Sequence, residues 1–212
     1  MCGRFTVGTG DIPGLRSRFG LDERVEVRRR FNVAPGDEVL AVTRDGATLL
    51  RWGFLRDSAY TTINARAESL MARPTWRSAL GDGRCLILAD GFYEWQRREG
   101  GNGLSKRPFW ITRADRQPFA FAGLASSWGT CAIVTTPATP LLAEVYDRMP
   151  AMLDPEQEDG WLASRTAPAA ALDMLAPFSE VDAVPVGDAV NDARYDGPAC
   201  LDPAPPPDPT LF

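Results

Sequence analysis

The stretch Arg84-Cys-Leu-Ile-Leu-Ala-Asp-Gly-Phe-Tyr-Glu-Trp-Gln96 contains two apolar, strand-like runs on either side of the pair Asp90-Gly91. Apolar runs bounded by an Asp-Gly pair predict two β-strands joined by a turn. The second run also places one carboxylate, Glu94, between Tyr93 and Trp95. The stretch therefore predicts a sheet at the centre of the fold and an acidic side chain in apolar surroundings.

Outward from this stretch, short strand-like runs mix with turns and a few short helical patterns. Further strands are expected at Gly3–Val7, Glu38–Thr43, Ala47–Phe54, Pro108–Arg113, Phe119–Leu124, Thr130–Thr135 and Val181–Val186. Helices are expected at Asp11–Phe19, Pro74–Leu80, Leu141–Asp147, Pro155–Ser164 and Pro168–Leu175. Because no βαβ rhythm is present, the pattern predicts an α+β fold: a single mixed domain with a central antiparallel, barrel-like β-sheet flanked by short helices.

Two segments look unlike the rest of the chain. The glycine-rich segment Arg98–Lys106 is expected to be a mobile loop. From Pro198 onward the chain is rich in proline and aspartate, so residues 198–212 are expected to form a disordered tail. The domain is therefore expected to span residues 2–197, within a chain of 212 residues that is 44% apolar and long enough for a sizeable core.

The net charge of −5 hides an asymmetry along the chain. Residues 1–113 hold 19 Lys+Arg against 13 Asp+Glu, whereas residues 114–212 hold 4 against 15. Lys106 is the only lysine, so nearly all the positive charge is arginine, whose planar fork suits phosphate oxygens. The first half carries either a face that binds a polyanion or an ordinary solvated basic surface, and charge alone does not separate the two.

The cysteines and the missing histidine restrict the possible chemistry. Cys2, Cys85, Cys131 and Cys200 are too widely spaced for a CxxC motif, and the chain has no histidine, which argues against a structural zinc site. No signal segment opens the chain and no apolar run approaches 18 residues. We expect a cytoplasmic, nucleoid-associated, monomeric protein with reduced thiols and no membrane contact.

Cys2 offers a reactive pair of groups. If Met1 is removed, the α-amine and the thiol of Cys2 sit on adjacent carbons, with ordinary pKa values near 8 and 8.5. Such a 1,2-aminothiol traps an aldehyde as a five-membered thiazolidine ring. The alternative is a terminal nucleophile of the amidohydrolase type, with peptidase-like activity.

Two further segments carry polar groups suited to work on an aldehyde or a phosphate. Desolvation between aromatic residues raises a carboxyl pKa, which would let Glu94 donate and accept protons near neutrality. The alternative is an outward-facing glutamate paired with an arginine. Asn64 offers an amide that can orient a carbonyl, and Arg66 offers a guanidinium for phosphate. The alternative there is a helix cap at Asn64 with a solvated Arg66.

Arginines alternate with aromatic residues in Arg28–Gly36 and in Arg51–Phe54. This composition is typical of surfaces on which the bases of a single strand stack and its phosphates are neutralised. The alternative is a basic loop beside a core tryptophan.

Eight short motifs occur in order along the chain. They are Met-Cys-Gly-Arg-Phe (1–5), Asn-Val-Ala-Pro-Gly (32–36), Arg-Trp-Gly-Phe (51–54), Asn-Ala-Arg-Ala-Glu (64–68), Ala-Asp-Gly-Phe-Tyr-Glu-Trp (89–95), Phe-Ala-Gly-Leu (121–124), Val-Thr-Thr (134–136) and Asp-Arg-Met-Pro (147–150). Together they resemble the SOS-response-associated peptidase family, whose members process abasic sites in single-stranded DNA. The resemblance runs from Cys2 to about Leu201.

The resemblance implies that Met1 is removed and that Cys2 forms a stable thiazolidine with the ring-opened aldehyde of an abasic site. It implies Glu94 as the acid/base group, Asn64 as the residue that orients the substrate and Arg66 as a phosphate contact. Other DNA-binding residues implied by the resemblance are Arg4, Asn32, Pro35, Trp52, Phe54, Thr135 and Arg148. No metal or organic cofactor is implied, and the expected partner is single-stranded DNA carrying an abasic site.

One residue departs from the family pattern. Relatives usually read Ile-His-Asp-Arg-Met-Pro where this chain has Val-Tyr-Asp-Arg-Met-Pro, so Tyr146 replaces the active-site histidine. With an ordinary pKa near 10, tyrosine is a poor proton shuttle at pH 7. Three alternatives follow: crosslinking with slower formation or poor reversal, a relative that binds single-stranded DNA without efficient covalent chemistry, or a changed substrate with peptidase-like activity.

The last residues suggest a second partner. The chain ends in Asp208-Pro-Thr-Leu-Phe212, and a flexible tail with a terminal Leu-Phe resembles the motif by which bacterial replication proteins bind the sliding clamp. Asp208 stands where that motif usually has glutamine. The alternative is a tail with no docking function.

Overall fold

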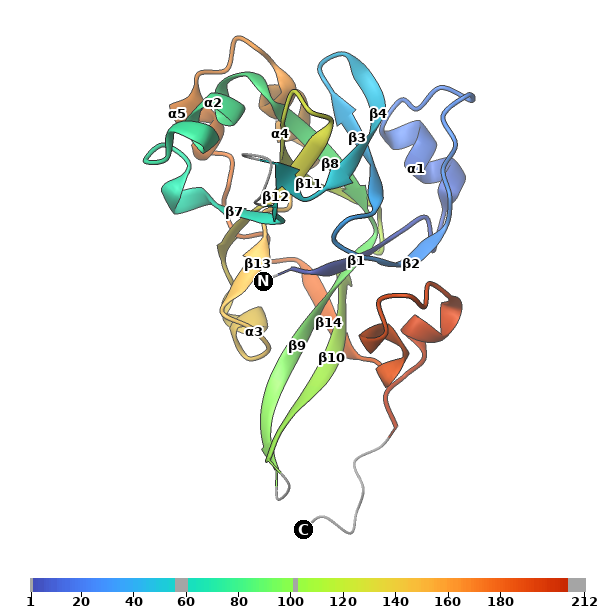
Figure 1. The fold of residues 1–212 in the computed structure, drawn as a ribbon. Coiled ribbons are helices and arrows are strands. Elements are labelled where there is room, and N and C mark those ends of the chain that lie inside the picture. Colours follow the sequence, from blue (N-terminus) through green and yellow to red (C-terminus); the bar gives the residue numbers. More distant parts are fainter. Residues whose placement is uncertain (1, 56–60, 101–102, 206–212) are drawn as a thin grey trace.

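The computed structural model describes residues 2–55, 61–100 and 103–205 (Figure 1). The strands are β1 (Arg4–Val7), β2 (Arg30–Val33), β3 (Glu38–Thr43), β4 (Gly46–Trp52), β5 (Phe54–Leu55), β6 (Thr61–Thr62), β7 (Asn64–Arg66), β8 (Arg84–Ala89), β9 (Gly91–Gly100), β10 (Gly103–Arg113), β11 (Phe119–Ala125), β12 (Thr130–Pro137), β13 (Arg148–Pro150) and β14 (Val181–Pro185). The α-helices are α1 (Ile12–Arg18), α2 (Pro74–Asp82), α3 (Pro140–Ala143), α4 (Pro155–Leu162) and α5 (Pro168–Leu172). Short 3₁₀ turns cover Ala67–Ser69, Asp188–Asn191 and Pro198–Leu201.

The strands form two main sheets and a small pair. One sheet has the order β14-β10-β9-β1-β2, and the other has the order β11-β8-β3-β4-β12-β13, with β7 also paired to β12. A further pairing joins β11 to β12, so the second sheet curls back on itself. All pairings are antiparallel except those of β12 with β4 and with β7. The predicted α+β class with mostly antiparallel strands is confirmed, but the strands divide between two sheets instead of forming one central sheet.

The Asp90-Gly91 pair joins the two sheets and does not close a hairpin. β8 pairs with β11 and β3, whereas β9 pairs with β1 and β10. The Asp90 carboxylate accepts hydrogen bonds from the Thr6 hydroxyl at 2.6 Å and from the Thr9 backbone N–H at 2.6 Å. These bonds hold the Asp90-Gly91 crossover against the end of β1. Where the sequence predicted a turn between paired strands, the chain instead passes from one sheet to the other.

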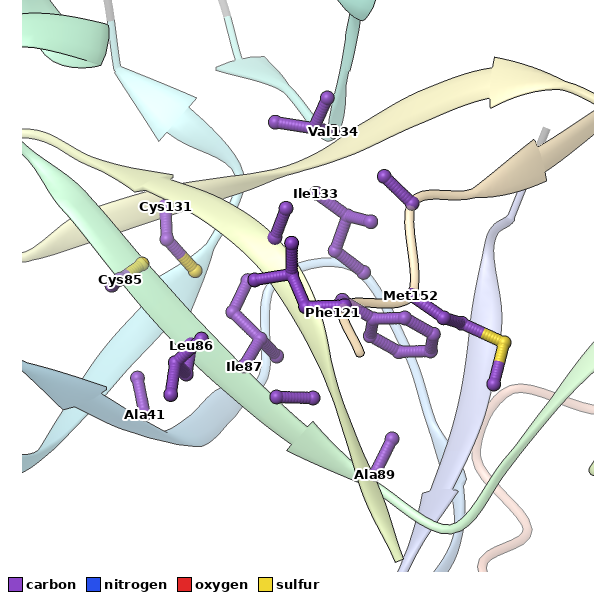
Figure 2. Packing of buried hydrophobic residues seen from close by; sticks show 14 of the residues in the cluster. Ala41, Cys85, Leu86, Ile87, Ala89, Phe121, Cys131, Ile133, Val134 and Met152 are labelled. Atoms are coloured by element: carbon purple, nitrogen blue, oxygen red, sulfur yellow. The ribbon is translucent and has the colours of Figure 1, made fainter. Parts of the chain in front are cut away.

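The core lies inside the curled sheet, where every residue of β8 is buried (Figure 2). Phe121 packs edge-on against Phe5 and Phe119, at ring-centre distances of 5.6 Å and 5.3 Å. Cys85 and Cys131 are fully buried there. The helices α2 and α4 pack against β8 and β11 on the outside of this sheet. No helix within the described ranges has the length and apolarity needed to span a membrane.

Two expectations of secondary structure from the sequence were wrong in part. Arg98–Gly100 and Gly103–Lys106 are strand and not loop, because β9 continues to Gly100, β10 starts at Gly103 and the two strands pair there, whereas residues 101–102 lie outside the described ranges. The helix expected over Leu141–Asp147 is limited to α3, which ends at Ala143. At Gly100 and Gly103, pairing between β9 and β10 outweighed the low strand propensity of glycine.

The first residues of the segment that was expected to be disordered, 198–212, are ordered. Pro198–Leu201 form a 3₁₀ turn whose Cys200 is fully buried against Tyr93 and Val190. Burial of this apolar side chain orders a segment whose composition alone indicated disorder. Residues 206–212 lie outside the described ranges, so clamp docking through Leu211-Phe212 stays a prediction, as does the monomeric state.

Gly91 provides a test of the crossover. A Cβ placed there would lie 2.1 Å from Trp110 Nε1 and 2.9 Å from Thr6 Oγ1, too close for either ring or strand to accept. We expect Gly91→Ala to lower the free energy of unfolding by about 1–3 kcal/mol, as for other overpacked sites. The control is Gly81→Ala in α2, where a Cβ meets nothing within 4 Å and should stabilise the helix by about 0.5–1 kcal/mol. Thermal unfolding of both variants measures the difference, and equal melting temperatures would contradict the assignment.

Candidate active site

Cys2 is held at the start of β1, between the two sheets. β1 pairs with β9 through Arg4 with Tyr93 and Phe5 with Phe92, which brings Cys2 next to the outgoing end of β9. The side chain of Cys2 is fully buried, and its thiol lies 3.7 Å from the carbonyl oxygen of Arg4. Burial raises the pKa of the thiol well above its ordinary value, and the charge of Glu94 raises it further. The thiol is therefore neutral at pH 7 in this state and needs a proton acceptor to react.

Asn64 reaches Cys2 from the other sheet. Asn64 lies on β7, opposite Ile133 of β12, and its side-chain Nδ2 donates a 2.8 Å hydrogen bond to the carbonyl oxygen of Cys2. The side chain is 8% exposed, and its Oδ1 accepts no hydrogen bond from the described residues. This amide positions Cys2 and keeps an acceptor oxygen beside it, so the helix-cap alternative does not hold.

Glu94 is a buried carboxylate next to the cysteine. It follows Tyr93 on β9 and is 5% exposed. Burial raises the pKa of this carboxyl from its ordinary 4.5 to about 7. A carboxyl with that pKa is about half ionised at neutral pH, so it can both give and take a proton. The alternative of an outward-facing glutamate is wrong, because the side chain points into the protein.

Glu94 forms the inner wall of a cleft of about 620 Å³. Its lining residues are Arg4, Glu94, Trp95, Arg97, Lys106, Tyr146 and Asn191. Arg4 Nη1 donates to Asn32 Oδ1 at 3.0 Å and to the carbonyl oxygen of Val190 at 2.9 Å, which fixes its guanidinium at the mouth. The structure thus brings four predicted residues, Arg4, Cys2, Glu94 and Tyr146, to one place.

A smaller cleft of about 220 Å³ lies on the Asn64 side. Asn64, Arg66 and Phe54 line it together with Arg73 and Trp76. Arg66 is exposed, and Phe54 packs against Trp76 at a ring-centre distance of 4.7 Å. The exposed guanidinium of Arg66 can bind an anionic group at this cleft.

Several residues expected to contact DNA are internal. Asn32, Trp52 and Thr135 are each at most 1% exposed. Asn32 Nδ2 donates to the backbone oxygens of Asp192 and Tyr195, and Trp52 Nε1 donates to the carbonyl oxygen of Ile63. These hydrogen bonds are internal to the fold. The three side chains therefore stabilise the residues around the site, and a ligand cannot contact them in this state.

Arg148 and Pro35 also differ from the expectation. The Arg148 guanidinium forms a two-point ion pair with Glu68, and its Nη2 donates to the carbonyl oxygen of Thr135 at 2.7 Å. This arginine is already neutralised. Pro35 is exposed in the turn between β2 and β3 and lines neither of the two clefts.

Sequence reasoning missed Arg97, Lys106 and Asn191 in the larger cleft and Arg73 in the smaller one. The segment that holds Arg97 and Lys106 was interpreted as the end of a strand followed by a loop. If the two strands had been predicted to pair through this segment, the sequence would have placed Lys106 opposite Arg97.

The sequence of this chain also matches a known family. The sequence model described as "SOS response associated peptidase (SRAP)" matches residues 1–193. The chain belongs to this family. Abasic site processing protein YoqW of Bacillus subtilis is 34% identical, with 95% of this chain and 99% of that protein covered. Abasic site processing protein YedK of Escherichia coli is 32% identical, with 82% and 84% covered.

The fold of the SRAP family extends to solved structures. A crystal structure of a protein from Bacteroides thetaiotaomicron superposes with a TM-score of 0.80 at 23% identity, covering 96% of this chain and all of that chain. At this identity the likeness shows the fold alone. These SRAP relatives are named abasic site processing proteins.

The buried carboxyl of Glu94 predicts a pH dependence of stability. Its pKa in the folded state, about 7, lies above the ordinary 4.5, so the folded protein binds this proton more tightly than the unfolded chain. The free energy of unfolding therefore falls as the pH rises from about 4.5 to about 7. Glu94→Gln should make this fall smaller, by up to about 3 kcal/mol.

The measurement is urea unfolding at pH 5 and at pH 8. Glu68→Gln is the control, because Arg148 lowers the pKa of Glu68 and moves its titration below this window. Glu158, whose pKa burial raises to about 7, leaves a residual fall in both variants. Identical pH profiles for the Glu94→Gln variant and the wild type would contradict the burial of a titrating carboxyl.

Proposed function

We propose that this protein processes abasic sites in single-stranded DNA by forming a covalent thiazolidine crosslink through Cys2 after Met1 is removed. The observation that carries the proposal is the grouping of Cys2, Asn64 and Glu94 where the two sheets meet, with Glu94 lining the larger cleft and Asn64 lining the smaller one. Asn64 bonds to the carbonyl oxygen of Cys2, and the Glu94 carboxyl, with a pKa of about 7, lies close enough to raise the pKa of the Cys2 thiol. The names of the SRAP relatives support the choice of an abasic site as the substrate.

The chemistry begins with the closed sugar. An abasic sugar is mostly a cyclic hemiacetal, and Glu94 takes the proton of its hydroxyl and returns one to the ring oxygen, which exposes the C1′ aldehyde. The α-amine of Cys2 then adds to C1′, and loss of water gives an imine. The Cys2 sulfur forms a bond to the same carbon, and the thiol proton ends on the nitrogen, which closes the five-membered ring.

The fold contributes position more than reactivity. Asn64 holds the backbone of Cys2, and its Oδ1 is placed to accept a hydrogen bond from a sugar hydroxyl. Holding amine, thiol and aldehyde together replaces a bimolecular encounter by an intramolecular one, which contributes on the order of 7–11 kcal/mol in well-aligned systems. Arg66 and Arg4 supply cations for the phosphates on either side.

Tyr146 decides how fast this chemistry runs. It is half-buried in the cleft with Glu94, and its backbone N–H is bonded to the carbonyl oxygen of Leu142 at 2.8 Å. A tyrosine hydroxyl can orient the substrate but exchanges protons poorly at pH 7. Glu94 therefore carries the proton transfers alone, and we expect slow formation or slow reversal of the crosslink.

The crosslink is tested with single-stranded DNA that carries one abasic site. The wild type should give a slower band on a denaturing gel, and the intact mass of the protein should lack Met1. Cys2→Ser should abolish the band, because an oxygen nucleophile does not close a stable ring of this kind. Cys200→Ser is the control, since this cysteine lies in a separate buried cluster with Tyr93.

Each other outcome selects another function. Binding of the DNA without a shifted band would leave a non-covalent DNA-binding relative. Release of peptides from protein substrates without any need for DNA would point to a peptidase.

The replacement at position 146 is tested separately. Tyr146→His places a group with an ordinary pKa near 6.5 in the cleft, so formation or reversal of the crosslink should become about tenfold faster or more at pH 7. Tyr146→Phe is the control, because it keeps the ring and removes only the hydroxyl. Rates of the histidine variant equal to those of the wild type would show that proton transfer does not limit the reaction.

A further inference from the structure

Two cations face each other across the β9–β10 hairpin. The register pairs Arg97 directly with Lys106, and both side chains are exposed. Like charges at directly opposed positions of an antiparallel pair repel and destabilise the sheet. Neither residue has an ion pair among the described residues. An arrangement that costs stability in the free protein is explained if an anion binds between the two side chains.

The cleft is polarised by charge. Its inner end holds the Glu94 carboxyl, whose pKa is raised by burial and, to a smaller degree, by Asp147. Its outer end holds Arg97 and Lys106. A neutral sugar suits the inner end, whereas an anion is repelled there and attracted to the outer end.

β9 runs along the cleft, because Glu94, Trp95 and Arg97 all line it. At about 3.3 Å per residue, Arg97 lies about 10 Å along the strand from Glu94. With about 3.4 Å of rise per nucleotide in a stacked strand, this distance corresponds to about three nucleotides.

We infer that Arg97 and Lys106 form a phosphate subsite that binds the DNA backbone within the first few nucleotides of the abasic sugar at Cys2. The inference rests on the proposed function and adds to it the residues that hold the flanking strand. Trp95 and Asn191 line the same cleft, and Trp95 Nε1 donates a hydrogen bond to Asn191 Oδ1 at 2.7 Å.

The test measures non-covalent binding as a function of salt. The probe is a single-stranded oligonucleotide with one tetrahydrofuran residue, which has the abasic shape but no aldehyde. Arg97→Gln, Lys106→Gln and the double variant are compared with the wild type by fluorescence anisotropy from 50 to 300 mM NaCl. Each single change should weaken binding several-fold at low salt and lower the slope of log K against log [salt] by up to about 0.7.

Two controls isolate the subsite. Arg165→Gln removes one exposed arginine from the loop after α4 and should leave the slope unchanged. Lys106→Arg keeps the charge and should bind like the wild type. Melting temperatures of the free Arg97→Gln and Lys106→Gln proteins at or above that of the wild type are expected, because one repulsion is removed.

The outcomes separate the two proposals. The phosphate subsite is overturned if the salt slopes of the Arg97→Gln and Lys106→Gln variants equal that of the wild type. It is also overturned if Arg165→Gln changes the slope by the same amount. Either result holds even if the wild type crosslinks authentic abasic DNA. Lower slopes in the cleft variants alone support the subsite. If they occur without any crosslink in the wild type, the covalent function fails and the phosphate subsite stands. A wild type that binds no single-stranded DNA overturns both.

Discussion

The antiparallel pairing of β1 with β9 is the interaction on which the site depends. It sets Arg4 opposite Tyr93, and the residues just outside this register, Cys2 and Glu94, come together at the point where the pairing stops. The Asn64 amide then ties Cys2 to the second sheet. A one-residue slip in this register would turn Glu94 to the opposite face of β9 and remove the carboxyl from the thiol.

The C-terminal segment around residues 190–196 stabilises this arrangement through hydrogen bonds to β1 and β2. Its backbone accepts hydrogen bonds from Asn32 and Arg4, and the Asp196 carboxylate accepts bonds from the backbone N–H groups of Phe31 and Asn32. Tyr93 donates to the carbonyl oxygen of Phe31 at 2.8 Å. Segments about 160 residues apart in the chain therefore hold the Arg4 guanidinium in the cleft. The same hydrogen bonds explain why Asn32 is internal, although its motif suggested a DNA contact.

Where sequence reasoning succeeded, the signal was local. Alternating and fully apolar runs located β3, β8, β11 and β12, and aromatic neighbours marked Glu94 as a carboxyl with a raised pKa. Where it failed, a distant partner decided. Gly100 and Gly103 became strand because β9 and β10 pair with each other, and Cys200 was ordered because Tyr93 and Val190 cover it.

The sequence by itself determined the α+β class, the family and the identity of the chemical groups, because apolar patterns, motif order and side-chain chemistry are properties of short segments. Only the tertiary structure decided which of these groups face one another. It buried Trp52 and Thr135, neutralised Arg148 with Glu68, and opposed Arg97 to Lys106. Strand register and burial set those relations, and both arise from contacts between residues far apart in the chain.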